Sequence, residues 1–240
     1  MTSHLLAVTF DASDPAVLAQ FWGGVLGRVM TVDQEGGIVL PPRDDHGFKV
    51  RFMPSTKPRV GPNRIHFDLT SSSDEVMQST IERALGLGGT HLDVGQLPEE
   101  GHVVLADPEG NEFCVIPPGN TFLADTDLIG AVNCEGTQAV GYFWSKALTW
   151  PLVWDQAQET AIQSPRGGSK VTWSGPPVAQ QDGKDRLHLE LATSVDGDHE
   201  AEVERLVALG ASRVDIGQGD VSWVAMVDPD GNEFRVHTPR

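Results

Sequence analysis

A tandem repeat constrains the fold of this 240-residue chain more than any other feature of its sequence. Three segments return in the same order: RIHFDLTSS as RLHLELATS, GGTHLDVGQ as GASRVDIGQ, and DPEGNEFCV as DPDGNEFRV. The first two pairs share one offset, and the third is one residue out of step. Ordered matches at one offset indicate a duplication. We therefore predict two domains, at residues 1–118 and 124–240.

Each half consists of two strand–helix–three-strand units. In the first unit the alternating LLAVTF predicts a strand. Asp14 followed by Pro15 predicts a helix start, with an N-cap and a proline at the first helical position. An apolar helical stripe follows and ends at Gly27. Because the same order recurs, the sequence predicts an α+β fold of four βαβββ units.

Charge and composition exclude several classes of partner. The chain has 34 Asp plus Glu against 17 Lys plus Arg, a formal net charge of −17. Nucleic acids and anionic membrane surfaces require a positive surface, so neither is expected as a partner. The apolar runs are too short to span a membrane, and the first residues do not resemble a signal peptide. Cys114 and Cys134 form no disulfide framework, so we expect reduced thiols in a cytoplasmic protein.

Strand alternation assigns the side chains to two faces of each sheet. At 64–70, Ile65, Phe67 and Leu69 form an apolar face opposite a polar one. The same division recurs in the other strands. We predict that the polar faces line a cup and contact a ligand through Lys49, Arg51, Arg64, His66, Asp68, Glu112, Cys114, Lys170, Thr172, His188, Glu190, Glu233 and Arg235.

A strand–helix–three-strand unit used four times resembles the vicinal oxygen chelate superfamily, which includes glyoxalase I, bleomycin-resistance proteins and extradiol dioxygenases. The resemblance covers nearly the whole chain. It rests on DPAVLAQFWGGVLG at the first helix and on DPEGNEF or DPDGNEF before the last strand of each half. It implies two glyoxalase-like domains, each an eight-stranded half-barrel cup with helices outside and the ligand site inside.

The resemblance also implies where a metal would be held. In superfamily metalloenzymes a His often opens the first strand of the second unit, and His66 and His188 match that position. Another usual ligand is a Glu three residues after the Asn of DPxGN, where this chain has Cys114 and Arg235. A guanidinium cannot ligate a metal, and a divalent ion needs three or four converging donors. We therefore predict no cofactor; a divalent metal, if bound, would take His66, Glu112 and Cys114.

Three functions follow from these observations. The favoured one is a metal-independent protein of the glyoxalase/bleomycin-resistance type that binds a polar or zwitterionic small molecule in a cup. The second is an enzyme with His66 and Glu112 as catalytic residues, either a metal-dependent lyase, isomerase or dioxygenase, or a metal-free catalyst with His66 as general base. The third is a non-catalytic scaffold with vestigial cups.

The fusion of two halves bears on the oligomeric state. Superfamily members often pair two halves across a dimer, and a fused chain can make that contact internally. We therefore expect a monomer or a homodimer. If only one cup is functional, the residues favour the cup of the first half.

Overall fold

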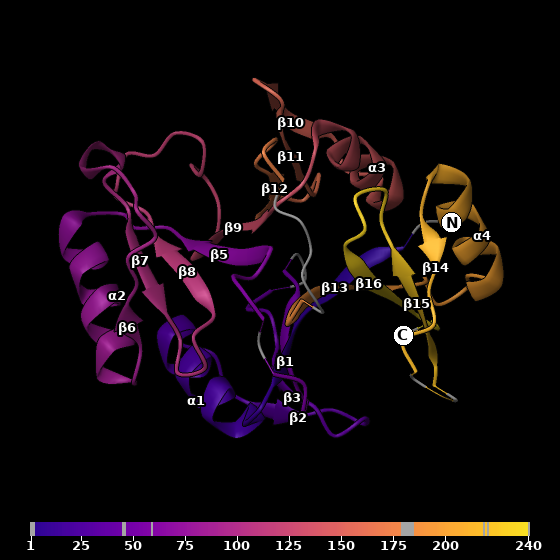
Figure 1. The fold of residues 1–240 in the computed structure, drawn as a ribbon, viewed down its shortest axis with the longest axis horizontal. Coiled ribbons are helices and arrows are strands. Elements are labelled where there is room, and N and C mark those ends of the chain that lie inside the picture. Colours follow the sequence, from indigo (N-terminus) through magenta and orange to yellow (C-terminus); the bar gives the residue numbers. More distant parts are fainter. Residues whose placement is uncertain are drawn as a thin grey trace.

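The computed structural model describes residues 3–44, 47–58, 60–178, 185–217, 219 and 221–239. Within them the chain forms two eight-stranded sheets flanked by helices (Figure 1). Sheet A has the order β14-β15-β16-β13-β1-β4-β3-β2, and sheet B has the order β10-β11-β12-β9-β5-β8-β7-β6. Both sheets mix parallel and antiparallel pairs.

The elements follow the predicted order through all four units. Sheet A contains β1 (His4–Ala12), β2 (Thr31–Val32), β3 (Ile38–Leu40), β4 (Lys49–Pro54), β13 (Leu187–Ala192), β14 (Ser212–Arg213), β15 (Trp223–Val227) and β16 (Glu233–His237). Sheet B contains β5 (Ile65–Leu69), β6 (Thr90–His91), β7 (Val103–Ala106), β8 (Glu112–Val115), β9 (Ile129–Cys134), β10 (Leu152–Gln156), β11 (Glu159–Gln163) and β12 (Lys170–Trp173). The helices are α1 (Pro15–Leu26), α2 (Asp74–Gly86), α3 (Gln138–Leu148) and α4 (His199–Leu209), with a short 3₁₀ turn at Pro98–Glu100.

The α+β class and the eight-stranded sheets are confirmed, but the sheets are not divided as expected. Each sheet joins a unit of one half to a unit of the other, so no cup belongs to a single half. The junctions are antiparallel pairs between first strands, β1 with β13 and β5 with β9. Through this pairing, the backbone groups at the open edge of each first strand find hydrogen-bond partners in a unit from the other half. Packing between helices stays within the halves, with α1 beside α2 and α3 beside α4 (Figure 1).

The helix signals predicted from the sequence are confirmed at α1. The Asp14 carboxylate accepts hydrogen bonds from the backbone N–H groups of Ala16 and Val17, at 3.1 and 3.2 Å. At the other end Gly27 adopts a left-handed conformation with φ of 61°, which glycine reaches without steric cost. No helix in the described residues is long and apolar enough to cross a membrane.

The repeated Trp and DPxGN motifs form a buried hydrogen bond in each half. The fully buried Trp22 of α1 donates from Nε1 to Asp107 Oδ2 of the first DPxGN turn, at 3.1 Å. Trp144 of α3 makes the same bond to Asp228 of the second turn, at 3.0 Å. Each Asp also accepts from its own turn, and burial is the largest influence on its pKa, which is raised despite those bonds. The motif therefore joins the two units of a half.

Candidate functional site

The structure divides the predicted ligand-contact residues between the polar faces of two sheets. Sheet A carries Lys49, Arg51, His188, Glu190, Glu233 and Arg235. Sheet B carries His66, Asp68, Glu112, Cys114, Lys170 and Thr172, with Arg64 directly before β5. The residues assigned to the cup of the first half are therefore separated, because Arg51 and His66 lie on different sheets.

Strand register aligns the two polar faces position by position. Across sheet A one row runs Lys49, Ala7, Glu190 and Arg235, and its equivalent in sheet B runs Lys170, Ala131, Asp68 and Cys114. The neighbouring rows run Arg51, Thr9 and His188 in sheet A, and Thr172, Asn133 and His66 in sheet B. The faces therefore differ chiefly by two arginines, which sheet B replaces with Thr172 and Cys114.

A buried carboxylate, Glu190, is the centre of the polar face of sheet A. Its side chain is fully buried and lies 3.2 Å from Arg51 Nη1 and 3.6 Å from Arg235 Nη1. His237 Nε2 and His188 Nε2 approach it at 3.2 and 3.4 Å. Burial opposes ionisation of Glu190, but the two histidines and the charge of Arg51 hold its pKa well below the usual range. The pKa of His188 is lowered by burial and by the Arg235 charge.

The two arginines of sheet A have further partners that fill its polar face. Arg51 contacts Asp33 at 2.6 Å and Glu35 at 2.7 Å, both from the loop after β2. The guanidinium of Arg235 stacks 4.5 Å from the ring centroid of Trp223. Arg51 and Arg235 are 3% and 6% exposed, so neither presents a free guanidinium to a ligand. Sheet A does not fit a superfamily metal, because Arg235 occupies a donor position and both guanidinium groups pair with the Glu190 oxygens.

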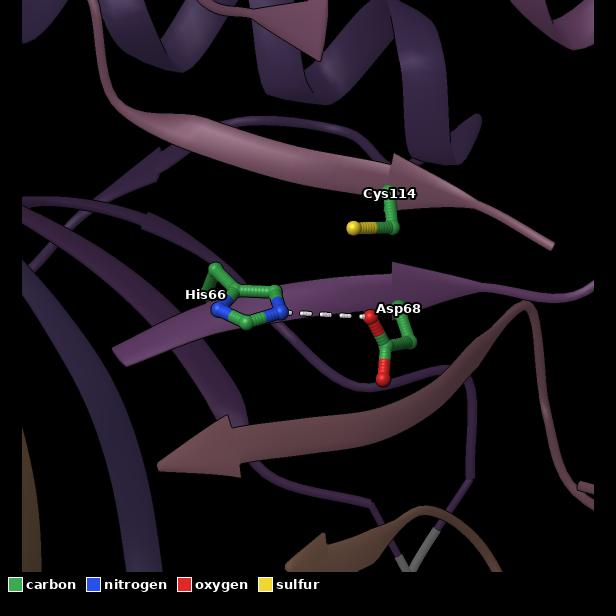
Figure 2. A group of neighbouring side chains, drawn as sticks. All are labelled: His66, Asp68 and Cys114. Atoms are coloured by element: carbon green, nitrogen blue, oxygen red, sulfur yellow. Dashed lines mark ion pairs between the residues drawn. The ribbon is translucent and has the colours of Figure 1, made fainter. Parts of the chain in front are cut away.

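Sheet B brings three different potential donors together, as Figure 2 shows. One ligand atom each of His66, Asp68 and Cys114 lies within 4.8 Å of the other two. His66 Nε2 is 3.4 Å from Asp68 Oδ1, and Asn133 Nδ2 donates to Asp68 Oδ2 at 3.3 Å. The side chain of His66 keeps 29% of its surface exposed. This cluster therefore offers a partly open imidazole, whereas His188 and His237 beside Glu190 in sheet A are buried.

Two predicted residues of sheet B have surroundings that limit their chemistry. Burial and the neighbouring Asp68 charge raise the pKa of the Cys114 thiol, so it is protonated at neutral pH. Glu112 accepts hydrogen bonds from Asn63, through the backbone N–H at 3.3 Å and Nδ2 at 2.9 Å. The three-donor cluster contains Asp68 and not Glu112. A metal on sheet B would thus be held by His66, Asp68 and Cys114, after the thiol had lost its proton.

A recess of about 110 Å³ adjoins this cluster through Asn133. Phe122 and Trp154 form one wall, with their ring centroids 5.6 Å apart and nearly perpendicular. Thr172 lines the same recess. Lys170 donates from Nζ to the Phe122 carbonyl and lies 4.7 Å from the centroid of its ring. Burial lowers the pKa of Lys170, with a smaller opposing effect from Asp125.

Arg64 differs from its repeat counterpart Arg186. Arg186 donates from Nε to the Asp11 carbonyl at 2.8 Å and forms an ion pair with Glu109. In the described residues the buried Nε and Nη2 of Arg64 have no hydrogen-bond partner. The acid at the matching place in the second turn is Asp230, which caps α3 by accepting from the backbone N–H of Thr137 at 2.6 Å. Arg64 therefore lacks the ion pair that its counterpart makes.

Sequence reasoning missed several residues of both faces. Asp33 and Glu35 come from a loop, and Phe122 comes from the segment that joins the halves, so strand alternation could not assign them to a face. Asn133 and Trp154 are in strands. Asn133 lies on the same side of β9 as Ala131, and this alternation was a signal that could have identified it.

Comparison with known protein families and solved structures agrees with the repeated fold described above. The sequence pattern of the glyoxalase-like domain matches residues 7–116 and again residues 130–237. Glyoxalase I from Zea mays has a similar fold, with a TM-score of 0.71 and 15% identity over 99% of this chain and 92% of that one. A candidate dioxygenase from Bacillus subtilis superposes with a TM-score of 0.64 and 14% identity, over 99% of this chain and 85% of that one. No curated protein sequence matches the chain.

Proposed function

The chain belongs to the glyoxalase-like domain family, and we propose that it binds a small molecule on the polar face of sheet B without a full superfamily metal site. One observation carries this proposal. The polar face of sheet A is filled by a buried ion-pair network, whereas sheet B keeps a recess of about 110 Å³ and a partly exposed His66. Ligand sites combine apolar walls with a few converging polar groups, which is what the recess offers.

The lining of sheet B indicates the class of ligand. Phe122 and Trp154 provide an aromatic wall for a planar or apolar portion. Asp68 would receive a donor group of the ligand, and the Lys170 ammonium would receive an acceptor. A polar or zwitterionic molecule with an apolar part satisfies all three, in agreement with the mixed charges predicted from the sequence.

A second candidate function is a metal-dependent lyase, isomerase or dioxygenase, and the convergence of His66, Asp68 and Cys114 favours it. A divalent ion there would polarise neighbouring oxygens of a substrate. Without a metal, His66 would act as a general base and Asp68 would orient its ring. Binding without a metal is favoured because Cys114 stands where the superfamily has a Glu ligand, and Glu112 accepts hydrogen bonds from Asn63 instead of joining the cluster.

The first experiment is a thermal-shift screen against metabolites and antibiotics, followed by calorimetry of the best compound. Thr172→Arg places in sheet B the residue that Arg51 supplies in sheet A, so it should fill the recess and weaken binding at least about tenfold. Thr172→Ser is the matched control and should bind as the native chain does. If no compound stabilises the protein, or Thr172→Arg binds unchanged, the proposal is wrong and the scaffold alternative gains support.

The second experiment separates binding from metal-dependent catalysis. The protein is purified without chelator, and Zn, Ni, Fe and Mn are measured by plasma mass spectrometry. We expect substoichiometric metal. Stoichiometric metal that is lost in Cys114→Ser and Asp68→Asn would instead establish the three-donor cluster as a metal site.

A further inference from the structure

A second cavity, of about 360 Å³, lies where the first unit meets the third. It is bounded by the start of β1, the residues before β4, the end of α3 and the turn between β11 and β12. None of its lining residues lines the recess of sheet B. Its volume lies within the range of small-molecule sites, at the lower end.

Positive charge gathers at this cavity in a chain whose net charge is −17. Arg166 lines the cavity and is exposed, as is the nearby Lys49. Within the described part of the chain neither side chain has an ion-pair partner. Both lie close enough to His4 to affect it: burial lowers the pKa of His4, and the charges of Lys49 and Arg166 lower it further.

Acids beside this region are already engaged. Asp44 accepts a hydrogen bond at 3.1 Å from the backbone N–H of Gly47, which lines the cavity. Glu202 accepts hydrogen bonds from the backbone N–H and the hydroxyl of Ser3, at 2.9 and 2.6 Å. It also pairs with Arg205 at 2.7 Å. Its carboxylate is therefore committed to Ser3 and Arg205 and does not neutralise Arg166 or Lys49. Arg166 at the cavity and Lys49 near it have no counter-ion among the described residues, so they provide a place for an anionic group from outside the chain.

Aromatic and aliphatic side chains form the remaining walls of the cavity. Phe48 and Leu148 are buried, and Trp150 is half-buried. Such side chains accommodate the flat body of a ligand, and an indole also attracts positive charge toward its face. The lining therefore combines an apolar slot with cations at its edge.

We propose that this cavity is a second small-molecule site, which takes a small anion with a planar apolar body, such as an aromatic carboxylate. Arg166 and Lys49 hold the carboxylate, and Phe48 and Trp150 contact the ring. Guanidinium and ammonium groups bind carboxylates through charge-assisted hydrogen bonds, which are stronger than neutral ones. The proposal goes beyond the ligand site on sheet B and does not depend on it.

Calorimetry with 1-naphthoate as the probe tests this proposal on the full chain. We expect saturable binding of one naphthoate, and much weaker binding of the neutral 1-naphthalenemethanol. Arg166→Gln should weaken naphthoate binding about tenfold or more, because a charge-assisted bond to the carboxylate is lost. Lys49→Gln should weaken it less. Arg213→Gln removes an exposed arginine that pairs with Glu200 and Glu204, and this control should bind normally.

The recess on sheet B supplies the discriminating control. Thr172→Arg should leave naphthoate binding unchanged, so loss of binding in that variant would overturn the proposal by assigning the probe to sheet B. Absence of saturable binding, equal affinity in Arg166→Gln, or equal affinity for the neutral alcohol would each overturn it as well. Because Arg166 is exposed and has no ion-pair partner in the part of the chain that the structure describes, its replacement should not unfold the protein, and circular dichroism checks this.

Discussion

The polar faces of sheets A and B have matching residue positions, but the side chains at two of these positions differ in size and charge. In sheet A, Arg51 and Arg235 meet at Glu190 in a buried ion-pair network. In sheet B the matching positions hold Thr172 and Cys114, which are shorter and uncharged, and a recess remains. Two differences at equivalent positions thus distinguish the face that holds a buried ion-pair network from the face on which we propose ligand binding. The fold alone determines neither outcome.

The largest effect should come from removing an arginine of sheet A. Arg51→Thr introduces the residue found at the matching position of sheet B and leaves Glu190 with one fewer counter-charge. Breaking a buried ion pair by removing one partner typically costs about 3–5 kcal/mol, which we expect as the loss in free energy of unfolding. Chemical denaturation measures it. Thr172→Ser on sheet B is the matched control, and an equal loss there would contradict the contrast between the faces.

Acidification should weaken the network of sheet A. His188 has a lowered folded pKa, so below its unfolded value near 6.5 the unfolded chain takes up a proton that the folded chain does not. Glu190 also has a lowered folded pKa, so its contribution is present above about 4.5 and is lost as the pH falls through the folded value. Both effects reduce stability toward low pH, by at most about 1.4 kcal/mol per pH unit for each proton.

Denaturation at pH 7.5, 6.0 and 5.0 measures this dependence. The groups that surround His188 are Glu190, Arg235 and Asp11, and His237 and Arg51 join through Glu190. His188→Gln should reduce the slope between pH 6.5 and 5. A slope that is unchanged in that variant would show that His188 is not its source.

The Trp–Asp hydrogen bond that both halves of the repeat retain should contribute equally to stability in each half. Trp22→Phe and Trp144→Phe each remove a hydrogen bond to a buried carboxylate, Asp107 or Asp228. Loss of a partner from a buried polar group costs about 1–3 kcal/mol, and we expect similar values for both variants from denaturant titration. A clear difference would mean that the halves have diverged in their cores as well as on their polar faces.

The smallest expected effect concerns Arg64. Asp230→Glu supplies the longer acid that Arg186 meets at Glu109 in the other half. An ion pair with the buried Arg64 should then stabilise the protein by about 0.5–1 kcal/mol. Glu109→Asp is the reciprocal variant and should destabilise. If the melting temperature does not rise in Asp230→Glu, the length of the acidic side chain does not explain why Arg186 has an ion pair and Arg64 does not.

Much of the local structure could be predicted because its causes are local. Asp14 and Gly27 bound α1 as expected, since caps act within one turn. Ile65, Phe67 and Leu69 are buried, as alternation along one strand requires. The candidate site was predicted only in part. Alternation identified His66, Asp68 and Cys114, but it could not identify which carboxylate would approach the other donors, and Asp68 takes the place expected for Glu112.

The sequence by itself determined four units, their helices, and which side chains share a face. Only the tertiary structure decided which units share a sheet, and therefore that Arg51 meets Glu190, 139 residues away. The reason is that strand pairing uses backbone groups, which are the same in every residue type apart from proline, so a strand edge does not specify its partner in the sequence. The ligand-binding potential of each face depends on that choice, because the arginines act only where the pairing brings them to a carboxylate.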